Sequence, residues 1–122
     1  MANCIYNSRA HTIFYAKKLT VMFKDLDQVL HSQVRLAIMS LLISVKSAEF
    51  SFLLENISTT KGNLSFQLSK LKEAEYIDIK KSFKGNYPLT TCEITAKGIN
   101  AYETYVNAID EYFKEFKTNK NS

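Results

Sequence analysis

One short segment carries side chains suited to an anionic, hydrogen-bonding partner. Between residues 60 and 74, Leu64, Leu68 and Leu71 recur at helical spacing, so they predict a helix with one apolar face. Its opposite face carries amide, hydroxyl and ammonium groups and no carboxylate. Such groups pair with phosphates and with the edges of bases. We therefore expect this face to contact nucleic acid through Thr60, Lys61, Asn63, Ser65, Phe66, Gln67 and Lys70.

The positive charge is concentrated in the same part of the chain. The 122 residues have a formal net charge of +4, but residues 59–90 hold six lysines against three acids, a local net charge of +3. Residues 23–58 and 91–122 each carry −1. A local excess of lysine favours an anionic partner such as double-stranded DNA.

Other kinds of chemistry have little support in the sequence. It contains no nucleophile beside a base, no glycine-rich phosphate loop and no suitably placed carboxylate pair, so we do not expect an enzyme. Cys4 and Cys92 form no disulfide framework, and neither His11 nor His31 lies near a set of metal ligands. We expect no metal and no cofactor. Cys92 alternates with Ile94, which predicts a buried thiol rather than a redox sensor.

The N-terminal segment, residues 1–22, is an extension whose structure the sequence does not define, although a short helix near residues 10–22 is one interpretation. Its apolar run Ile13–Ala16 is ended by Lys17 and Lys18, which is too short for a membrane span and poor for a signal peptide. We therefore expect a cytoplasmic protein that does not enter membranes. Met22 is a sensible alternative start for the domain that follows.

The length fits a single domain, and few glycines and prolines favour helices. We predict a short helix at 25–31, a central helix from an N-cap at Ser32 to about Val45, a strand entered at Phe50, and a helix at 51–57 capped by Ser51. The helix at 61–74 follows a short turn. A β-hairpin then pairs 77–80 with 90–94. This order, a helix-turn-helix followed by a hairpin, is that of a winged helix: a mainly α, α+β fold.

The last predicted helix begins at a Thr95 cap and ends near Phe116. Its apolar residues recur at alternating spacings of three and four, which is a heptad seam. Two tyrosines form a second apolar strip beside it. The seam predicts a homodimer interface, although packing within the domain is an alternative. The interface residues would be Ile99, Tyr102, Tyr105, Val106, Ile109, Tyr112, Phe113 and Phe116.

The stretch from Asp25 to about Phe113 resembles the MarR/ArsR-like winged helix transcriptional regulators, in a small single-domain subgroup. The resemblance is carried by the segments 31–36, 60–65, 89–90 and 94–95, by Ala74 and Tyr76, and by Gly98. It implies a homodimer on operator DNA, with the terminal helix at the interface. It also implies that helix 61–74 faces the major groove and that the wing contacts the backbone through Lys80, Lys81, Lys84 and Asn86.

The sequence departs from that subgroup at three places. Glu75 stands where the subgroup tends to have a glycine that closes the helix, so the helix is expected to end differently. Gln67 replaces a frequent histidine, which changes the expected base preference. Asn86 and Leu89 stand where basic residues are common, so weaker wing contacts are expected.

These observations together predict a winged helix DNA-binding domain at 23–94, a dimerisation helix at 95–117 and a frayed tail at 118–122. The function we expect is that of a dimeric, repressor-like transcriptional regulator. A winged helix that binds another protein and no DNA is the alternative. A third interpretation has a small-molecule effector enclosed by the terminal helix and residues 1–22. Two side chains stay ambiguous: Arg35 between a phosphate and an ion pair with Asp25 or Asp27, and Phe66 between packing on the preceding helix and a thymine methyl group.

Overall fold

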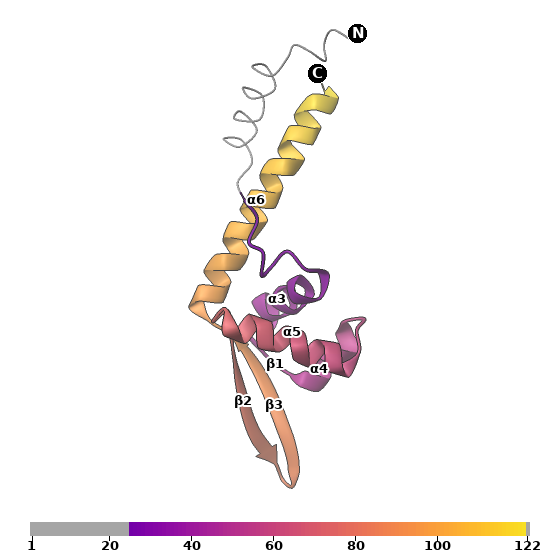
Figure 1. Cartoon of the computed structure of the whole chain (residues 1–122), viewed down its shortest axis with the longest axis vertical. Coiled ribbons are helices and arrows are strands. Elements are labelled where there is room, and N and C mark those ends of the chain that lie inside the picture. The colour runs from indigo at the N-terminus through magenta and orange to yellow at the C-terminus, as the bar shows by residue number, and fades with distance from the viewer. Residues whose placement is uncertain (1–24, 122) are drawn as a thin grey trace. The chain divides into compact units, whose positions relative to one another are not determined.

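A computed structural model describes residues 25–121, so the predicted helix at 10–22, and the extension that contains it, lie outside the described residues. Helices and a three-stranded antiparallel sheet alternate in the order of a winged helix (Figure 1). The chain divides into two compact units, one formed by residues 27–105 and the other containing the chain from Val106 onward. The elements are α3 (Gln33–Val45), β1 (Ser47–Glu49), α4 (Phe50–Asn56), α5 (Lys61–Glu73), β2 (Ile77–Lys84), β3 (Tyr87–Ile94) and α6 (Ala96–Asn121).

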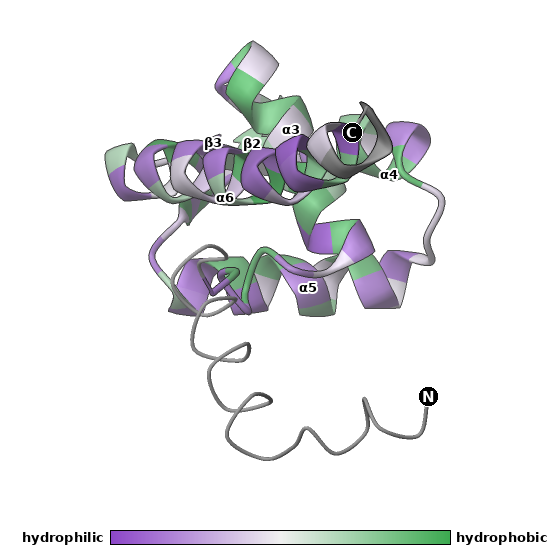
Figure 2. Cartoon of the chain, turned by 90° about the horizontal axis from the view of Figure 1, so that it is seen from above, coloured by the Kyte–Doolittle hydropathy of each residue, from purple (hydrophilic) through white to green (hydrophobic). Residues whose placement is uncertain are grey.

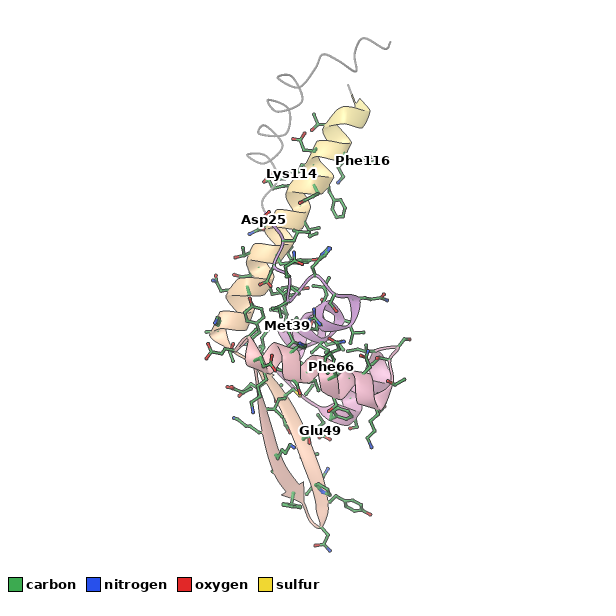
Figure 3. All side chains as sticks on the ribbon, viewed as in Figure 1. Asp25, Met39, Glu49, Phe66, Lys114 and Phe116 are labelled. Atoms are coloured by element: carbon green, nitrogen blue, oxygen red, sulfur yellow. The ribbon has the colours of Figure 1, made fainter. Side chains whose placement is uncertain are left out.

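The central helix is α3, and it begins and ends close to its predicted bounds. Ser32 has extended backbone, and its hydroxyl accepts a hydrogen bond from the backbone N–H of Arg35, as expected of an N-cap. Ile38, Met39 and Leu42 are completely buried. Figure 3 labels Met39 on this helix, in the interior of the unit. The apolar face predicted for α3 therefore forms the middle of the core.

The short helix predicted at residues 25–31 is wrong, because this segment is a hydrogen-bonded turn. The carboxylate of Asp27 accepts hydrogen bonds from the backbone N–H groups of Val29 and Leu30, at 2.8 and 3.3 Å. A side chain that satisfies these donors competes with the helical pattern. Leu30 is nevertheless completely buried, so its apolar character was a signal of the core rather than of a helix.

The segment after α3 also differs in detail from the prediction. Phe50 begins α4 and is not in a strand, while Ser51 lies inside the helix and does not cap it. The strand is instead Ser47–Glu49, which pairs with β3 through the register Ala48 to Cys92. Glu49 occupies the N-cap position without a side-chain hydrogen bond. The apolar Phe50 had suggested a strand because short apolar runs do not distinguish strand from helix.

The hairpin is longer than the sequence indicated. β2 and β3 pair over eight residues each, from Ile77 opposite Ile94 to Lys84 opposite Tyr87. Gly85 takes the first of the two loop positions with a φ of 67°, where a residue with a side chain would be strained. The sheet order is β1-β3-β2. Figure 1 shows the hairpin extending away from α3, α4 and α5.

The last helix begins where it was predicted but ends later. The hydroxyl of Thr95 accepts a hydrogen bond from the backbone N–H of Gly98 at 2.9 Å, so the predicted cap is confirmed. α6 runs to Asn121, so residues 118–121 of the tail that was predicted to be frayed belong to the helix. Glycine and proline, which commonly end helices, are absent from residues 117–122 of the sequence. None of the helices among residues 25–121 is long and apolar enough to cross a membrane.

Candidate nucleic-acid interface

Three leucines fix the orientation of α5. Leu64 and Leu71 are completely buried and Leu68 is 2% exposed, so this side of the helix belongs to the core. Thr60 caps the helix: its hydroxyl accepts a hydrogen bond from the backbone N–H of Asn63 at 3.1 Å. Figure 2 shows hydrophilic and hydrophobic residues alternating along α5. The helix thus has one face in the protein and one in solvent, as its leucine spacing predicted.

The solvent side of α5 holds the side chains that the sequence selected. Gln67 is half-buried, whereas the others are exposed. Phe66 is 56% exposed, and the ammonium group of Lys70 lies 5.2 Å from the centre of its ring, in a cation–π contact. Figure 3 labels Phe66 on α5, and more than half of its surface is open to solvent. We call this surface the α5 outer face. It consists of the half-buried Gln67 and of six exposed residues, which are Thr60, Lys61, Asn63, Ser65, Phe66 and Lys70.

A chain of side-chain hydrogen bonds joins this face to α3. Arg35 Nη1 donates to Gln67 Oε1, and Gln67 Nε2 donates to Asn63 Oδ1 at 3.1 Å. Asn63 Nδ2 in turn donates to Thr59 Oγ1 at 2.8 Å. Arg35 Nε also donates to the backbone carbonyl of Val29. The two amides that could read bases are therefore connected to each other and to a guanidinium group.

The ion pair suggested for Arg35 does not form. The Asp27 carboxylate is occupied by backbone N–H groups and by the hydroxyl of Tyr76, which donates to Oδ2. Arg35 is held by Gln67 and by main-chain carbonyls instead. The sequence could not reveal the pair of Arg35 and Gln67, because these residues are 32 positions apart and a hydrogen bond between them leaves no periodic pattern.

α5 ends through a left-handed residue even though that residue is not glycine. Glu75 has a φ of 66°, and the backbone N–H groups of Glu75 and Tyr76 donate to the carbonyls of Lys72 and Leu71, at 2.9 and 3.0 Å. This is the Schellman arrangement. The expectation that Glu75 would make the helix end differently is wrong, because the surrounding contacts enforce the strained conformation.

Contacts to the start of α6 hold this helix end. The Thr95 hydroxyl donates to the carbonyl of Glu75 at 2.8 Å, and the Thr95 backbone N–H donates to the carbonyl of Tyr76 at 3.0 Å. Lys97 forms an exposed ion pair with Glu75 at 3.1 Å. A Cβ atom on Gly98 would lie 2.1 Å from the Tyr76 carbonyl oxygen. Only glycine therefore fits where α6 passes the end of α5.

The wing carries its predicted basic residues in exposed positions. Lys80, Lys81, Lys84 and Asn86 all face solvent, although Lys80 also forms an ion pair with Glu93 at 3.2 Å. Two aromatic residues near the tip were missed by the sequence reasoning. They are Phe83, 74% exposed, and Tyr87, 78% exposed. Their positions, each two residues from Gly85 in the hairpin turn, could have indicated exposure, because the tip of a hairpin lies far from the core.

The predicted seam of α6 divides into two parts. Within the unit formed by residues 27–105, Tyr102 shares a hydrogen bond with the Ser40 hydroxyl at 2.9 Å, and Tyr105 shares one with His31 Nδ1 at 2.9 Å. Tyr105 is only 5% exposed, so it is a core residue and has little surface left for a partner. Ile99 is half-buried in the same unit. For Ile99, Tyr102 and Tyr105, the alternative of packing within the domain therefore describes the contacts better.

The later part of α6 is different. Val106, Tyr112, Phe113 and Phe116 are 45%, 39%, 59% and 65% exposed, and Ile109 is half-buried. The ring of Phe116 is seen projecting from the helix in Figure 3. Four of these residues, Val106, Ile109, Phe113 and Phe116, continue the seam, and Tyr112 lies beside it. This exposed apolar strip, residues 106–116, is the part of the predicted interface that a partner could cover.

Other sites for chemistry are few in the part of the chain that the structure describes. Residues 25–121 contain no group of three or more His, Cys, Asp and Glu side chains arranged to hold a metal ion. Cys92 is completely buried, as predicted. Burial raises the pKa of its thiol to about 11, so the thiolate that redox chemistry requires is scarce near neutral pH.

Comparison with known proteins agrees with this geometry. The chain is 33% identical over 90 residues to an uncharacterized protein of Methanocaldococcus jannaschii, which covers 74% of this chain and 98% of that protein. The fold of the present chain is similar to that of a transcriptional regulator homologue from Pyrococcus horikoshii OT3. The TM-score is 0.69, with 24% identity over 74% of this chain and 89% of that one.

A crystal structure of a putative MarR-family transcriptional regulator from Enterococcus faecalis V583 is also similar. Its TM-score is 0.64, with 14% identity over 77% of this chain and 84% of that one. Residues 34–113 match the family described as the winged helix DNA-binding domain. The predicted α+β winged helix fold is thus confirmed, and the chain belongs to the family of winged helix DNA-binding domains.

Proposed function

We propose that this protein is a sequence-specific transcriptional regulator, acting as a repressor, that binds double-stranded DNA as a homodimer. The recognition helix is α5, which enters the major groove, and the wing lies along the DNA backbone. The observation that carries the proposal is the α5 outer face: Asn63, Ser65 and Lys70 are exposed while the leucines behind them are buried. A helix with this inventory fits the width and the hydrogen-bonding groups of the major groove.

The charged and amide groups have different tasks in this proposal. The lysines of α5 and of the wing neutralise phosphates, and this contributes most of the affinity without regard to sequence. Asn63 and Gln67 provide discrimination, since a side-chain amide can accept from adenine N6 and donate to N7. Phe66 is exposed on the same face and offers an apolar contact to a thymine methyl group.

A second copy of the chain is the partner we propose for the strip at residues 106–116. Val106, Ile109, Phe113 and Phe116 continue the heptad spacing, and this spacing is what lets two helices interlock along a seam. Side chains as large as Phe113 and Phe116, both more than half exposed, favour association in water. A two-fold symmetric dimer would read a palindromic operator with half-sites about one helical turn apart.

The exposed face of α5 also separates this proposal from a protein-binding module. Such a module would present an acidic or apolar face on that helix, whereas here the face is polar and basic apart from Phe66. A small-molecule effector is not needed for any step of the proposal.

The test is selection of bound sequences from random double-stranded DNA, followed by binding measurements on the enriched duplex over a range of salt concentrations. We expect a palindromic consensus and a logarithmic salt slope of about −0.9 for each neutralised phosphate. A control duplex of the same length with a shuffled sequence should bind more weakly with a similar slope. A protein that enriches no sequence, or binds without salt dependence, would contradict the proposal.

A further inference from the structure

We propose that Arg35 is a positioning residue for base recognition, whose guanidinium group orients the amides of Gln67 and Asn63 while it is itself held by the protein. The inference rests on the proposed function, because it concerns the same face of α5. It is carried by the directional chain of hydrogen bonds from Arg35 through Gln67 and Asn63 to Thr59.

The guanidinium group is also anchored by two main-chain carbonyls of the turn that precedes α3. Its Nε donates to the carbonyl of Val29, and Nη2 lies 3.5 Å from the carbonyl of Gln28. Nη1 makes the bond to Gln67, so each of the three nitrogens has an acceptor within the chain. Arg35 is half-buried in this position. These contacts direct the group toward Gln67 rather than toward a phosphate.

The series of hydrogen bonds from Arg35 to Thr59 has a fixed direction, because a guanidinium group can only donate. Gln67 must therefore turn its oxygen toward Arg35, and this places Nε2 against Asn63. Asn63 must in turn present its oxygen to Nε2, so that Nδ2 points at the hydroxyl of Thr59. Reversing the Gln67 amide would bring its NH₂ group against the guanidinium donors, which costs a hydrogen bond and adds a repulsion.

This direction matters for reading bases. An amide has a donor side and an acceptor side, and a reversed amide offers the opposite pattern to a base pair. The side-chain amides of Gln67 and Asn63 each still have one N–H and one oxygen lone pair that these bonds do not use. Arg35 therefore selects one pattern before DNA arrives, and it reduces the side-chain freedom that must be lost on binding.

The experiment compares two duplexes, the one enriched by the wild-type protein from random DNA and a shuffled duplex of the same length. The dissociation constant of the shuffled duplex is divided by that of the enriched duplex, and this ratio measures discrimination. The ratio and the salt slope are measured for the wild type, Arg35→Ala, Gln67→Ala and the double variant. Arg35→Ala should lower the ratio about fivefold, near the lower end of what one amide–adenine pair contributes. Binding to the shuffled duplex and the salt slope should not change.

The double variant separates positioning from a general structural role. Loss of the bonds to Val29 and Gln28 lowers the melting temperature in both backgrounds. In the Gln67→Ala background, however, Arg35→Ala should leave the ratio unchanged, because the amide that it orients is absent. Arg35→Lys retains the charge and the aliphatic stem but not the forked donors, so it should fold and recover only part of the ratio.

A second readout needs no DNA. In the free protein, the side-chain amide protons of Gln67 and Asn63 should give separate, protected NMR signals, and Arg35→Ala or Arg35→Lys should move both toward the positions of solvent-exposed amides. The proposal is overturned if these signals do not move, or if the ratio falls equally in both backgrounds. It is also overturned if Arg35→Ala weakens both duplexes alike and reduces the salt slope by about 0.9, because that result identifies a phosphate contact.

The proposed function and this inference fail in different ways. A wild-type protein that enriches no sequence ends both. A wild-type protein that enriches a sequence, and whose discrimination survives the loss of Arg35, ends only the inference.

Discussion

The hydroxyl of Tyr76 donates a hydrogen bond to the carboxylate of Asp27, and so joins the end of α5 to the turn that precedes α3. The same carboxylate accepts from the backbone N–H groups of Val29 and Leu30. One acidic side chain thus organises the turn and ties it to a tyrosine 49 residues away. This relationship gives the first prediction.

Alkaline pH should weaken the fold through Tyr76. Burial, followed by the hydrogen bond and negative charge of Asp27, raises its pKa from 10.0 to about 12. A raised pKa in the folded state means that the contribution is complete below pH 10 and is lost as pH rises to about 12. Urea unfolding at pH 7 and at pH 11 should show this loss, and Tyr76→Phe should remove that part of the pH dependence. At pH 7 the variant should be less stable by about 1–2 kcal/mol. Equal pH dependence in the two proteins would contradict this assignment.

Gly98→Ala should strongly destabilise the domain. Its Cβ would lie 2.1 Å from the carbonyl oxygen of Tyr76, so the backbone of one element must move, at a cost of about 1–3 kcal/mol or more. Gly62→Ala is the matched control, because a Cβ there meets nothing within 4 Å. The control should keep or slightly raise the melting temperature, since alanine is the better helix former. Similar melting temperatures for both variants would show that the close approach is absent.

Glu75→Gly should stabilise the protein. The φ of 66° costs a residue with a side chain about 1 kcal/mol relative to glycine. The ion pair of Glu75 with Lys97 is exposed on both sides and contributes little. Chemical denaturation should therefore show a gain of up to about 1 kcal/mol, and Lys97→Ala should show almost no change. A loss of stability in Glu75→Gly would mean that the ion pair outweighs the strain.

Lysine and amide substitutions on α5 should affect DNA binding differently. Lys70→Ala should weaken the enriched and shuffled duplexes by the same factor and lower the salt slope by about 0.9. Asn63→Ala should keep the slope but flatten the preference at one base step, at a cost of about 1–3 kcal/mol on the preferred sequence. Titration of both duplexes with each variant measures these effects. The assignment is wrong if the two variants behave alike.

Ile109→Glu should give a folded monomer. A carboxylate placed on the heptad seam at residues 106–116 must be desolvated by a partner helix, which disfavours association by several kcal/mol. Asn107→Glu is the matched control, because it adds the same charge to an exposed position on the other side of the helix. Sedimentation should show a dimer for the control and a monomer for Ile109→Glu, with equal circular dichroism. A dimer in both cases would exclude this seam as the interface.

Much of the fold follows from local patterns in the sequence. The spacing of Leu64, Leu68 and Leu71 placed α5 and its outer face correctly, and the predicted caps Ser32 and Thr95 are signals that act within three residues. Periodicity and capping need no knowledge of tertiary contacts, so they are readable before the fold is known.

The errors arose where distant contacts decide the structure. The turn after Asp27 has helix-like apolar spacing, but its carboxylate satisfies the backbone and Tyr76 holds it in place. Arg35 meets Gln67 only because α3 and α5 lie side by side in the folded chain. The exposure of Phe83 depends on how far the hairpin extends beyond the core, and pairing length is set by both strands together.

The contacts of Thr95 and Gly98 with the end of α5 have a mechanical consequence. Two main-chain carbonyls, those of Glu75 and Tyr76, are engaged by the first turn of α6, and no space remains between Gly98 and Tyr76. The first turn of α6 therefore cannot shift relative to the last turn of α5, and the two turns must tilt together as one rigid body. Any force that turns the beginning of α6 also re-aims the side chains that α5 presents to solvent.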